Sequence, residues 1–287
     1  MCTAFGVSRS GYYAWKERKL SKQFRANQFM IKVIKKIHRR SFGIYGNPRI
    51  TAMLHRQGIE VSENRVARLM QANGIVGRIH AKKARAPSVN GVIKRTDNKR
   101  LSTPRPTRIN QVWAGDVTYL WFQNKWYYLA VVMDIYSRKI IGWSLESYRR
   151  KELTMQALEH ALQNRQLEPR MLLHSDRGVE YAAKGYRVIL KQNNIRPRMN
   201  RPGHCTDNAH VESFFHSMKG EWIKGNKYDT VDVLLNAVRS YIVDFYNRTR
   251  LHSSLSYCSP NEFERLQVHH YSVHFFGGRL HPKRCTL

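Results

Sequence analysis

The sequence predicts an α/β protein with a mixed sheet and flanking helices, preceded by an all-helical, helix-turn-helix-like region. From residue 109 onward, three consecutive runs are rich in aromatic and β-branched residues, and helical and strand-like segments alternate after them. Before residue 80, apolar residues recur at helical spacing. A hydrophobic content of 42% supplies a packed core for a chain of 287 residues, which excludes disorder throughout.

Three helices are predicted in the first region. Lysines and arginines separate the apolar positions of residues 26–40, which indicates an amphipathic helix with a basic outer face. Two short helices follow within 45–77, where Pro48 can open the first, Gly58 ends it and Ser62 can cap the second. The side chains that we expect these helices to bury are Phe29, Val33, Ile37, Ile50, Met53, Leu54, Val66, Leu69 and Met70.

We interpret residues 1–80 as a helical DNA-binding region, with the helix-turn-helix-like pair at 45–77. Arg65 and Arg68 are expected to be exposed on the second helix of that pair, where they could contact DNA. Plain packing of two helices is as consistent with the pattern. Residues 81–108 have no hydrophobic period but nine basic residues and three prolines, so they are predicted to be a basic linker.

The second region is predicted from its strands and helices in order. Strands are expected at 111–122, 126–137 and 138–147, joined by short turns, and again at 171–174 and 196–199. Helices are expected at 151–165, 186–195, 207–223 and 230–247. The catalytic core is assigned to 109–267, and 268–287 is treated as a tail.

The charge of the chain indicates a polyanionic partner. Lysine and arginine number 50 against 20 acidic residues, for a net charge of +30. Residues 1–108 alone hold 25 basic and 4 acidic side chains. Nucleic acid is the commonest partner of such a chain, although a ribosomal-type or merely supercharged surface has the same composition.

Membrane insertion and a disulfide framework are not indicated. No apolar run approaches the roughly 18 residues of a membrane span, and the first residues lack the apolar segment of a signal peptide, so a cytoplasmic location is expected. The four cysteines are scattered without a CxxC pair, which argues against structural zinc.

Three acids have positions that suggest chemistry. Asp116 lies mid-strand in an apolar run, Asp176 follows a short buried strand, and Glu212 lies in a predicted helix. A lone buried carboxylate costs several kcal/mol, and ligands of α/β folds gather at the carboxyl ends of strands. Taken singly, each acid also fits an ordinary role, as a turn cap, an arginine partner or a surface residue.

Carboxylates that meet at one sheet edge repel each other, and divalent cations relieve the repulsion. All-oxygen ligands suit Mg²⁺ or Mn²⁺ rather than zinc. Two such ions about 3.5–4 Å apart can activate one oxygen and stabilise another in phosphodiester cleavage. The three acids therefore predict a two-metal site.

Several strings around these acids stand in a fixed order. WAGDVTYL (113–120), HSDRGVEY (174–181) and DNAHVESFFHSMKGE (207–221) resemble the DDE transposases of the retroviral-integrase superfamily, and more narrowly the catalytic protein of the IS-three family of bacterial insertion sequences. The resemblance extends through YNRTRLHSSL (246–255) and SPNEF (259–263), and back through ENRVARLM (63–70), YGNPRI (45–50) and GVSRSGYYAW (6–15). It covers nearly the whole chain.

The resemblance implies a ribonuclease H-like core whose metal ligands are Asp116, Asp176 and Glu212. It also implies metal-dependent DNA cleavage and strand transfer, with Lys219 contacting the DNA near the cut phosphate. His174 and Asn208 correspond to neighbours of the acids that can shape the site by hydrogen bonding. The basic segment Arg248, Arg250 and His252 could touch the DNA backbone or merely pack.

This chain departs from the family pattern in places. NRPGHCT (200–206) lacks the serine and asparagine expected in the loop before Glu212, and Ser259 stands where threonine is usual. The histidines of the tail, His269, His270, His274 and His281, lie outside the resemblance and match no metal-binding spacing.

The expected partners are the terminal inverted repeats and target DNA, bound by a homo-oligomer. Members of this family are commonly made by frameshifting, so the upstream-frame product of the same element is a candidate partner. Two other functions stay open: a catalytically inactive DNA-binding repressor from a decayed element, and a structure-specific nuclease with the same core.

Overall fold

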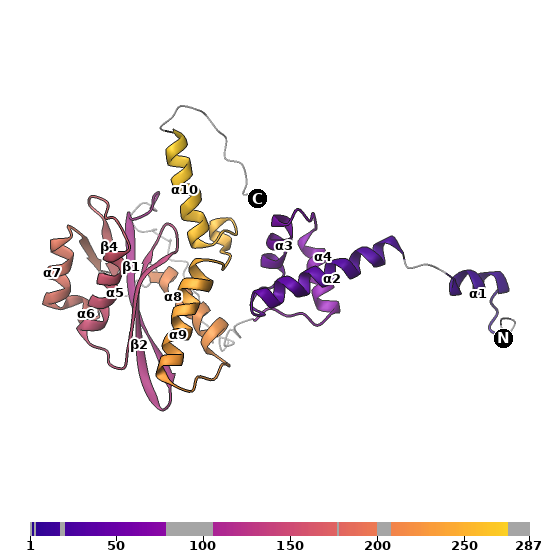
Figure 1. The fold of residues 1–287 in the computed structure, drawn as a ribbon, viewed down its shortest axis with the longest axis horizontal. Helices are drawn as coiled ribbons and strands as arrows, with labels where there is room; N and C mark the ends of the chain where they lie inside the picture. Colours follow the sequence, from indigo (N-terminus) through magenta and orange to yellow (C-terminus); the bar gives the residue numbers. More distant parts are fainter. Residues whose placement is uncertain are drawn as a thin grey trace, which may run out of the picture. The chain divides into compact units, whose positions relative to one another are not determined.

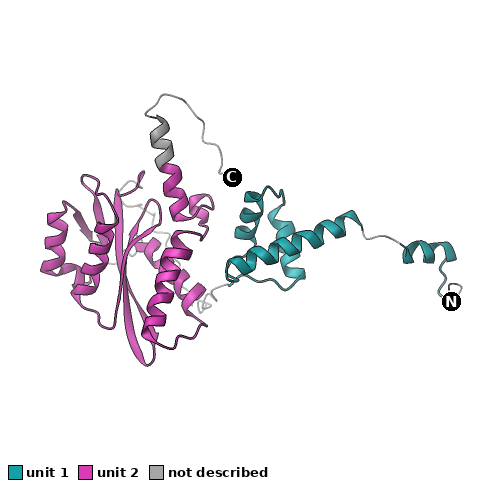
Figure 2. Ribbon diagram, in the orientation of Figure 1, with its two compact units in different colours: residues 1–78, 286–287 teal, residues 79–285 magenta. Residues whose placement is uncertain are grey.

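The computed structural model describes residues 2, 4–17, 21–78, 106–176, 178–199 and 208–274, without the side chains of 199 and 268–274. The chain divides into two compact units, residues 1–78 with 286–287, and residues 79–285 (Figure 2). The predicted linker lies almost wholly outside the described residues. The tail is outside as well, apart from the backbone up to residue 274.

Four helices make up the first unit: α1 (Arg9–Lys16), α2 (Lys22–Arg40), α3 (Asn47–Arg56) and α4 (Glu63–Ala72). Local signals set their ends, as the sequence predicts. Pro48 occupies the first turn of α3, and the Ser62 hydroxyl accepts a hydrogen bond from the Arg65 N–H to cap α4. The helix α1 was not expected from the sequence.

The buried face of α2 corrects one expectation. Phe29 is 59% exposed, and the buried side chains are Met30, Ile34 and Ile37. Both Phe29 and Met30 begin a stripe at helical spacing, so periodicity alone cannot choose between them. Packing of α2 against α3 and α4 selected the stripe of Met30.

The second unit is built on a five-stranded mixed sheet in the order β3-β2-β1-β4-β5. Its strands are β1 (Val112–Phe122), β2 (Lys125–Asp134), β3 (Ile140–Glu146), β4 (Leu172–Ser175) and β5 (Arg196–Met199). The first three pair antiparallel in sequence order, whereas β4 and β5 continue the sheet in parallel beside β1. The predicted strands and the mixed class are confirmed.

Helices cover both faces of this sheet (Figure 1). The helices α5 (Lys151–Gln163), α6 (Val179–Ala182) and α7 (Lys184–Gln192) gather on one side. With the sheet they enclose a core that includes Trp113, Leu158 and Tyr186. On the other side lie α8 (Ala209–Met218), α9 (Val231–Ser240) and α10 (Pro260–His274).

Two of the long helices continue as π-helix. After α8 comes η2 (Lys219–Ile223), and after α9 comes η3 (Tyr241–Asn247); a short 3₁₀ turn, η4 (Ser253–Leu255), follows later. The sequence predicted uninterrupted helices over both stretches, because a widened turn leaves no mark on hydrophobic periodicity. The apolar stripe of the second stretch, Leu234, Val238, Tyr241 and Phe245, is buried.

No helix within the described residues is both long enough and apolar enough to cross a bilayer.

Candidate active site: three carboxylates around the central strand

Asp116 lies in the middle of β1, the central strand of the sheet, and is half-buried. Its Oδ1 accepts a hydrogen bond of 2.8 Å from the N–H of Val117. Strand β1 is held by β2 on one side and by β4 on the other. The backbone that carries this carboxylate is therefore fixed from both sides.

Asp176 follows the last residue of β4, which runs parallel to β1. Gly115 and Ser175 are register partners, so the next residues along the two strands are Asp116 and Asp176. Neighbouring strands lie about 4.8 Å apart, so the two acids lie side by side at the edge of the sheet where β4 ends. The Asp176 Oδ1 accepts a hydrogen bond of 2.9 Å from the Gly178 N–H.

Glu212 is brought to this edge by α8. It lies in the first turn of the helix and is exposed. Just before that turn, the buried Asn208 donates a hydrogen bond of 3.4 Å from Nδ2 to the carbonyl of Gly115, the residue before Asp116. Asn208 thus ties the start of the Glu212 helix to the strand of Asp116.

The charges of the three acids act on one another. Burial raises the pKa of Asp116 to about 7, against the Val117 hydrogen bond, which lowers it. The negative charges of Asp176 and Glu212 raise the pKa of Asp116 further, and Arg149 lowers it. The charged form of Asp116 is thus disfavoured by burial and by two neighbouring carboxylates.

Within the described residues, no three His, Cys, Asp or Glu side chains form a group close enough to hold a metal ion together. The three acids thus influence each other through charge without forming a closed coordination shell. Their chemistry nevertheless fits a hard divalent cation, because every donor is a carboxylate oxygen and the group has excess negative charge.

An ion pair that the sequence did not reveal borders the acids. Glu180 is buried, and its Oε1 accepts hydrogen bonds from Nε and Nη2 of Arg149 at 3.0 and 2.6 Å. The two residues line an open cavity of about 530 Å³ with Arg150 and Lys151. Glu180 lies within HSDRGVEY, the string that includes Asp176, and this was the available signal.

Lys219 lies over an aromatic ring rather than free in solvent. Its Nζ is 4.6 Å from the centroid of the Tyr119 ring, and partial burial lowers the pKa of the ammonium. Lys219 follows Glu212 by seven residues, two turns of helix, so it is on the same side of α8.

Arg250 corrects another expectation. It was a candidate for contact with DNA, with packing as the alternative, and it is only 4% exposed. Its Nε and Nη2 donate to Glu221 at 2.7 and 2.5 Å, and Nη2 also donates to the Ser217 hydroxyl. Arg250 therefore joins η2 to the chain after η3. Arg248, two residues earlier, is exposed.

The remaining candidate residues differ in how far they are exposed. His174 is buried on β4, and His252 packs edge-on against the Tyr246 ring. In the first unit Arg68 is exposed, whereas Arg65 is half-buried and donates to Asn27 Oδ1 at 2.7 Å, contrary to the expected exposure of both. The contact with α2 explains the difference, since it draws the Arg65 guanidinium inward.

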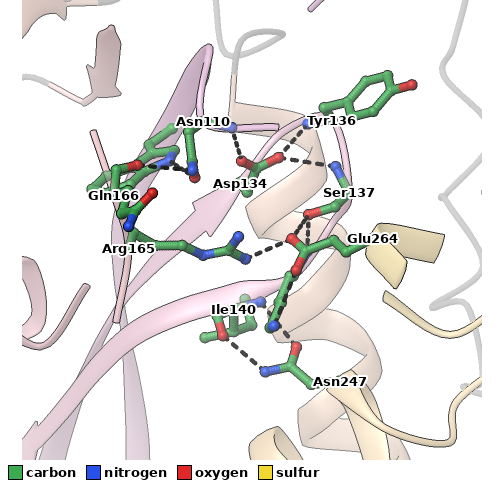
Figure 3. A network of polar contacts seen from close by, with 11 residues as sticks. Asn110, Asp134, Tyr136, Ser137, Ile140, Arg165, Gln166, Asn247 and Glu264 are labelled. Carbon is green, nitrogen blue, oxygen red and sulfur yellow. Dashed lines mark hydrogen bonds and ion pairs between the residues drawn. The ribbon is translucent and has the colours of Figure 1, made fainter. Parts of the chain in front are cut away.

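Asp134 is a second acid inside the sheet, and the sequence alone did not point to it. Asp134, the last residue of β2, is fully buried and accepts backbone hydrogen bonds from Asn110, Tyr136 and Ser137 (Figure 3). The Ser137 hydroxyl continues the network to Glu264 of α10. Glu264 also binds Lys139 and Arg165. This network fastens a loop and a helix to the sheet.

Comparisons with known proteins agree with this architecture. Residues 106–205 and 193–260 match families described as integrase core domain, and residues 25–83 match an HTH-like domain. The chain is 36% identical to the transposase InsF for insertion sequence IS3A of Escherichia coli (strain K12), over 92% of each chain. The chain belongs to the IS3 family of insertion-sequence transposases.

A further IS-element protein is similarly close. The insertion element IS600 uncharacterized 31 kDa protein of Shigella sonnei is 36% identical over 92% of this chain and 97% of its own length. As an IS3-family transposase, the chain is an enzyme of DNA transposition, and the match to the integrase core confirms the expected ribonuclease H-like class.

Solved structures with a similar chain path include two viral integrases. The simian T-cell lymphotropic virus intasome has 18% identity and a TM-score of 0.46, covering 87% of this chain and 76% of that one. The HTLV-2 integrase catalytic core domain in complex with magnesium has 15% identity and a TM-score of 0.42, covering 54% and 97%. At these scores the family assignment rests on the sequence relatives.

Proposed function

We propose that this transposase cleaves and rejoins DNA strands at a site made by Asp116, Asp176 and Glu212, which together bind two divalent cations, Mg²⁺ or Mn²⁺. The observation that supports this proposal is the electrostatics of Asp116. Its pKa of about 7 reflects burial beside two further acids, which the positive charge of Arg149 offsets only in part. A cation with hard-ligand preference would restore the balance.

The residues of the chain orient the site. Asp116 and Asp176 come from neighbouring parallel strands, and Asn208 fixes the start of the helix that carries Glu212. The chemistry that bound cations supply is activation of the attacking oxygen and stabilisation of the leaving one. Because binding requires carboxylates, Asp116 gives up its proton when the site fills. No protein nucleophile is needed.

The proposed DNA contacts come from exposed or half-buried basic residues in both compact units. Lys219 would meet the phosphate backbone near the cut, and Arg248 would meet it farther along. Arg68, with Arg65 in a supporting position, would contact the terminal inverted repeats. We further propose that the chain acts as a homo-oligomer on target DNA, with the upstream-frame product of the same element as a candidate partner. Its proposed location is the nucleoid of a bacterial cytoplasm.

The test is Asp116→Asn, which keeps the shape of the side chain and removes its charge. Cleavage and strand transfer on terminal-repeat DNA should fall at least about a thousandfold, because the loss of one metal ligand removes several kcal/mol of transition-state stabilisation. Affinity for the same DNA, measured by gel shift, should stay within about twofold, since DNA affinity comes mainly from lysine and arginine.

The matched control is Asp244→Asn, an exposed acid on η3. It should retain cleavage and joining. Joining retained by Asp116→Asn would refute the assignment. Absence of metal-dependent nicking by the unaltered chain would favour a DNA-binding repressor, and cleavage without joining would favour a nuclease.

A further inference from the structure

The outer end of the β1–β2 hairpin exposes three aromatic side chains, which we call the aromatic patch: Tyr119, Trp121 and Trp126. Their exposed fractions are 58%, 55% and 45%. Tyr119 and Trp121 alternate along β1 with the buried Leu120 and Phe122, so the patch lies on one face of the hairpin. Figure 1 shows the hairpin extending past α6 and α7.

The rings form one group. Trp126 packs edge-on against Tyr119 and Trp121, with centroid distances of 5.1 and 4.6 Å. Edge-to-face packing fixes the orientation of the rings, and each side chain stays about half exposed. Contiguous exposed apolar groups of this kind on a folded protein mark a binding surface.

Basic side chains lie at and near the aromatic patch. The Lys219 ammonium lies over the Tyr119 ring. At the tip of the hairpin, Gln123 Nε2 donates a hydrogen bond of 2.7 Å to the carbonyl of Asp229. The segment between η2 and Asp229, which this bond holds at the tip, has two exposed lysines, Lys224 and Lys227.

The aromatic patch is linked to the acids through Lys219, whose ammonium lies over the Tyr119 ring. Lys219 follows Glu212 by seven residues, about 10 Å at the rise of a helix. Tyr119 itself is three residues beyond Asp116 on β1, with its side chain on the opposite face of the strand. A few nucleotides span that distance.

We propose that the aromatic patch binds unpaired nucleotides of the DNA substrate, next to the phosphodiester held at the acids. Every base has a face that stacks on an aromatic ring, and lysines neutralise the intervening phosphates, so this surface suits single strands of any sequence. The inference rests on the proposed function, because it requires DNA at Asp116. A second copy of the chain is a less favourable occupant, since a symmetric contact would bring like-charged lysines together.

The experiment compares two labelled duplexes of equal length, one fully paired and one with a short unpaired end, by fluorescence anisotropy with the full chain. The unaltered chain should bind the duplex with the unpaired end more tightly. Trp121→Ala and Trp126→Ala should each lower that affinity about tenfold, as expected for one lost stacking contact, and leave the paired duplex within about twofold. Trp121→Phe should retain most of the preference, because it keeps a ring face.

Val188→Ala is the control, since Val188 is 43% exposed on α7 of the same unit and lies outside the aromatic patch. It should change neither affinity. Equal affinity of the unaltered chain for both duplexes would overturn the inference, as would an equal loss for both in Trp121→Ala. A shift from dimer to monomer in sedimentation velocity, with the DNA preference intact, would assign the patch to a second copy.

Failure of the proposed function would look different. Asp116→Asn should keep the preference for unpaired ends while losing cleavage, because the patch does not depend on the acid. If the unaltered chain prefers unpaired ends but never cleaves DNA, the proposed catalytic site at Asp116, Asp176 and Glu212 is refuted. The nucleotide-binding role of the aromatic patch would stand.

Discussion

Asp116 and Asp134 are carboxylates on neighbouring strands of one sheet, and burial raises the pKa of both. Their surroundings differ in the number of donors. Asp134 accepts three backbone hydrogen bonds, from Asn110, Tyr136 and Ser137 (Figure 3). Asp116 accepts one, from Val117, and faces the charges of Asp176 and Glu212.

The comparison teaches how to separate a structural acid from a functional one. The direction of the pKa shift is the same at both positions, so burial alone does not distinguish them. Donors do: a buried carboxylate surrounded by N–H groups holds the fold together, whereas one surrounded by other carboxylates is left for a ligand. Local rules are satisfied at Asp134 and violated at Asp116, as is common at functional sites.

The largest expected difference is in stability. Asp134→Ala leaves three N–H groups around a buried site without an acceptor, at roughly 1–3 kcal/mol each, so the free energy of unfolding should fall by at least about 3 kcal/mol. Asp116→Ala should lower it by less than about 1 kcal/mol, because the substitution also removes repulsion between carboxylates. Urea denaturation of both variants measures this. Equal losses would remove the distinction.

The next effect is a pH dependence of stability in the metal-free protein. The pKa of Asp116 is about 7 in the folded chain and near 3.8 when unfolded, so the folded state binds an extra proton between these values. The contribution of Asp116 to the free energy of unfolding should therefore be most favourable below about pH 4 and should decrease as the pH rises to about 7.

The size of that fall should be about 2 kcal/mol, roughly half of the ~4 kcal/mol that a shift from 3.8 to about 7 corresponds to, because solvent screens a half-buried carboxylate. Thermal unfolding in EDTA, compared between the unaltered chain and Asp116→Asn, isolates the contribution. A difference between the two chains that does not change with pH would contradict the raised pKa.

The smallest effect is stabilisation by Mg²⁺. At a concentration ten times its dissociation constant, a ligand of the folded state adds about 1.4 kcal/mol, or roughly 3–5 °C in Tm for a domain of this size. The unaltered chain should show this shift, and Asp116→Asn should show little of it. Asp134 already accepts three backbone hydrogen bonds and should not bind the ion. A Tm shift that was lost in an Asp134 variant and kept in Asp116→Asn would contradict the comparison.

Much of the fold followed from local sequence. The strands and helix ends were predicted because alternation, helical spacing and capping residues such as Pro48 and Ser62 act over a few neighbours. The three acids were singled out by their placement in apolar runs, and the ordered strings around them identified the family. The π-helical turns were missed, since no local pattern encodes them.

The sequence by itself determined the five strands, most of the long helices, the family and the acids worth testing. Only the tertiary structure decided that Phe29 is exposed, that Arg250 is buried against Glu221, and that Asp134 is saturated with donors while Asp116 is not. The physical reason is that these outcomes depend on partners from other elements, such as Tyr136, Glu221 or the α3–α4 pair. Spacing along one segment shows which residues share a face, but packing decides what that face meets.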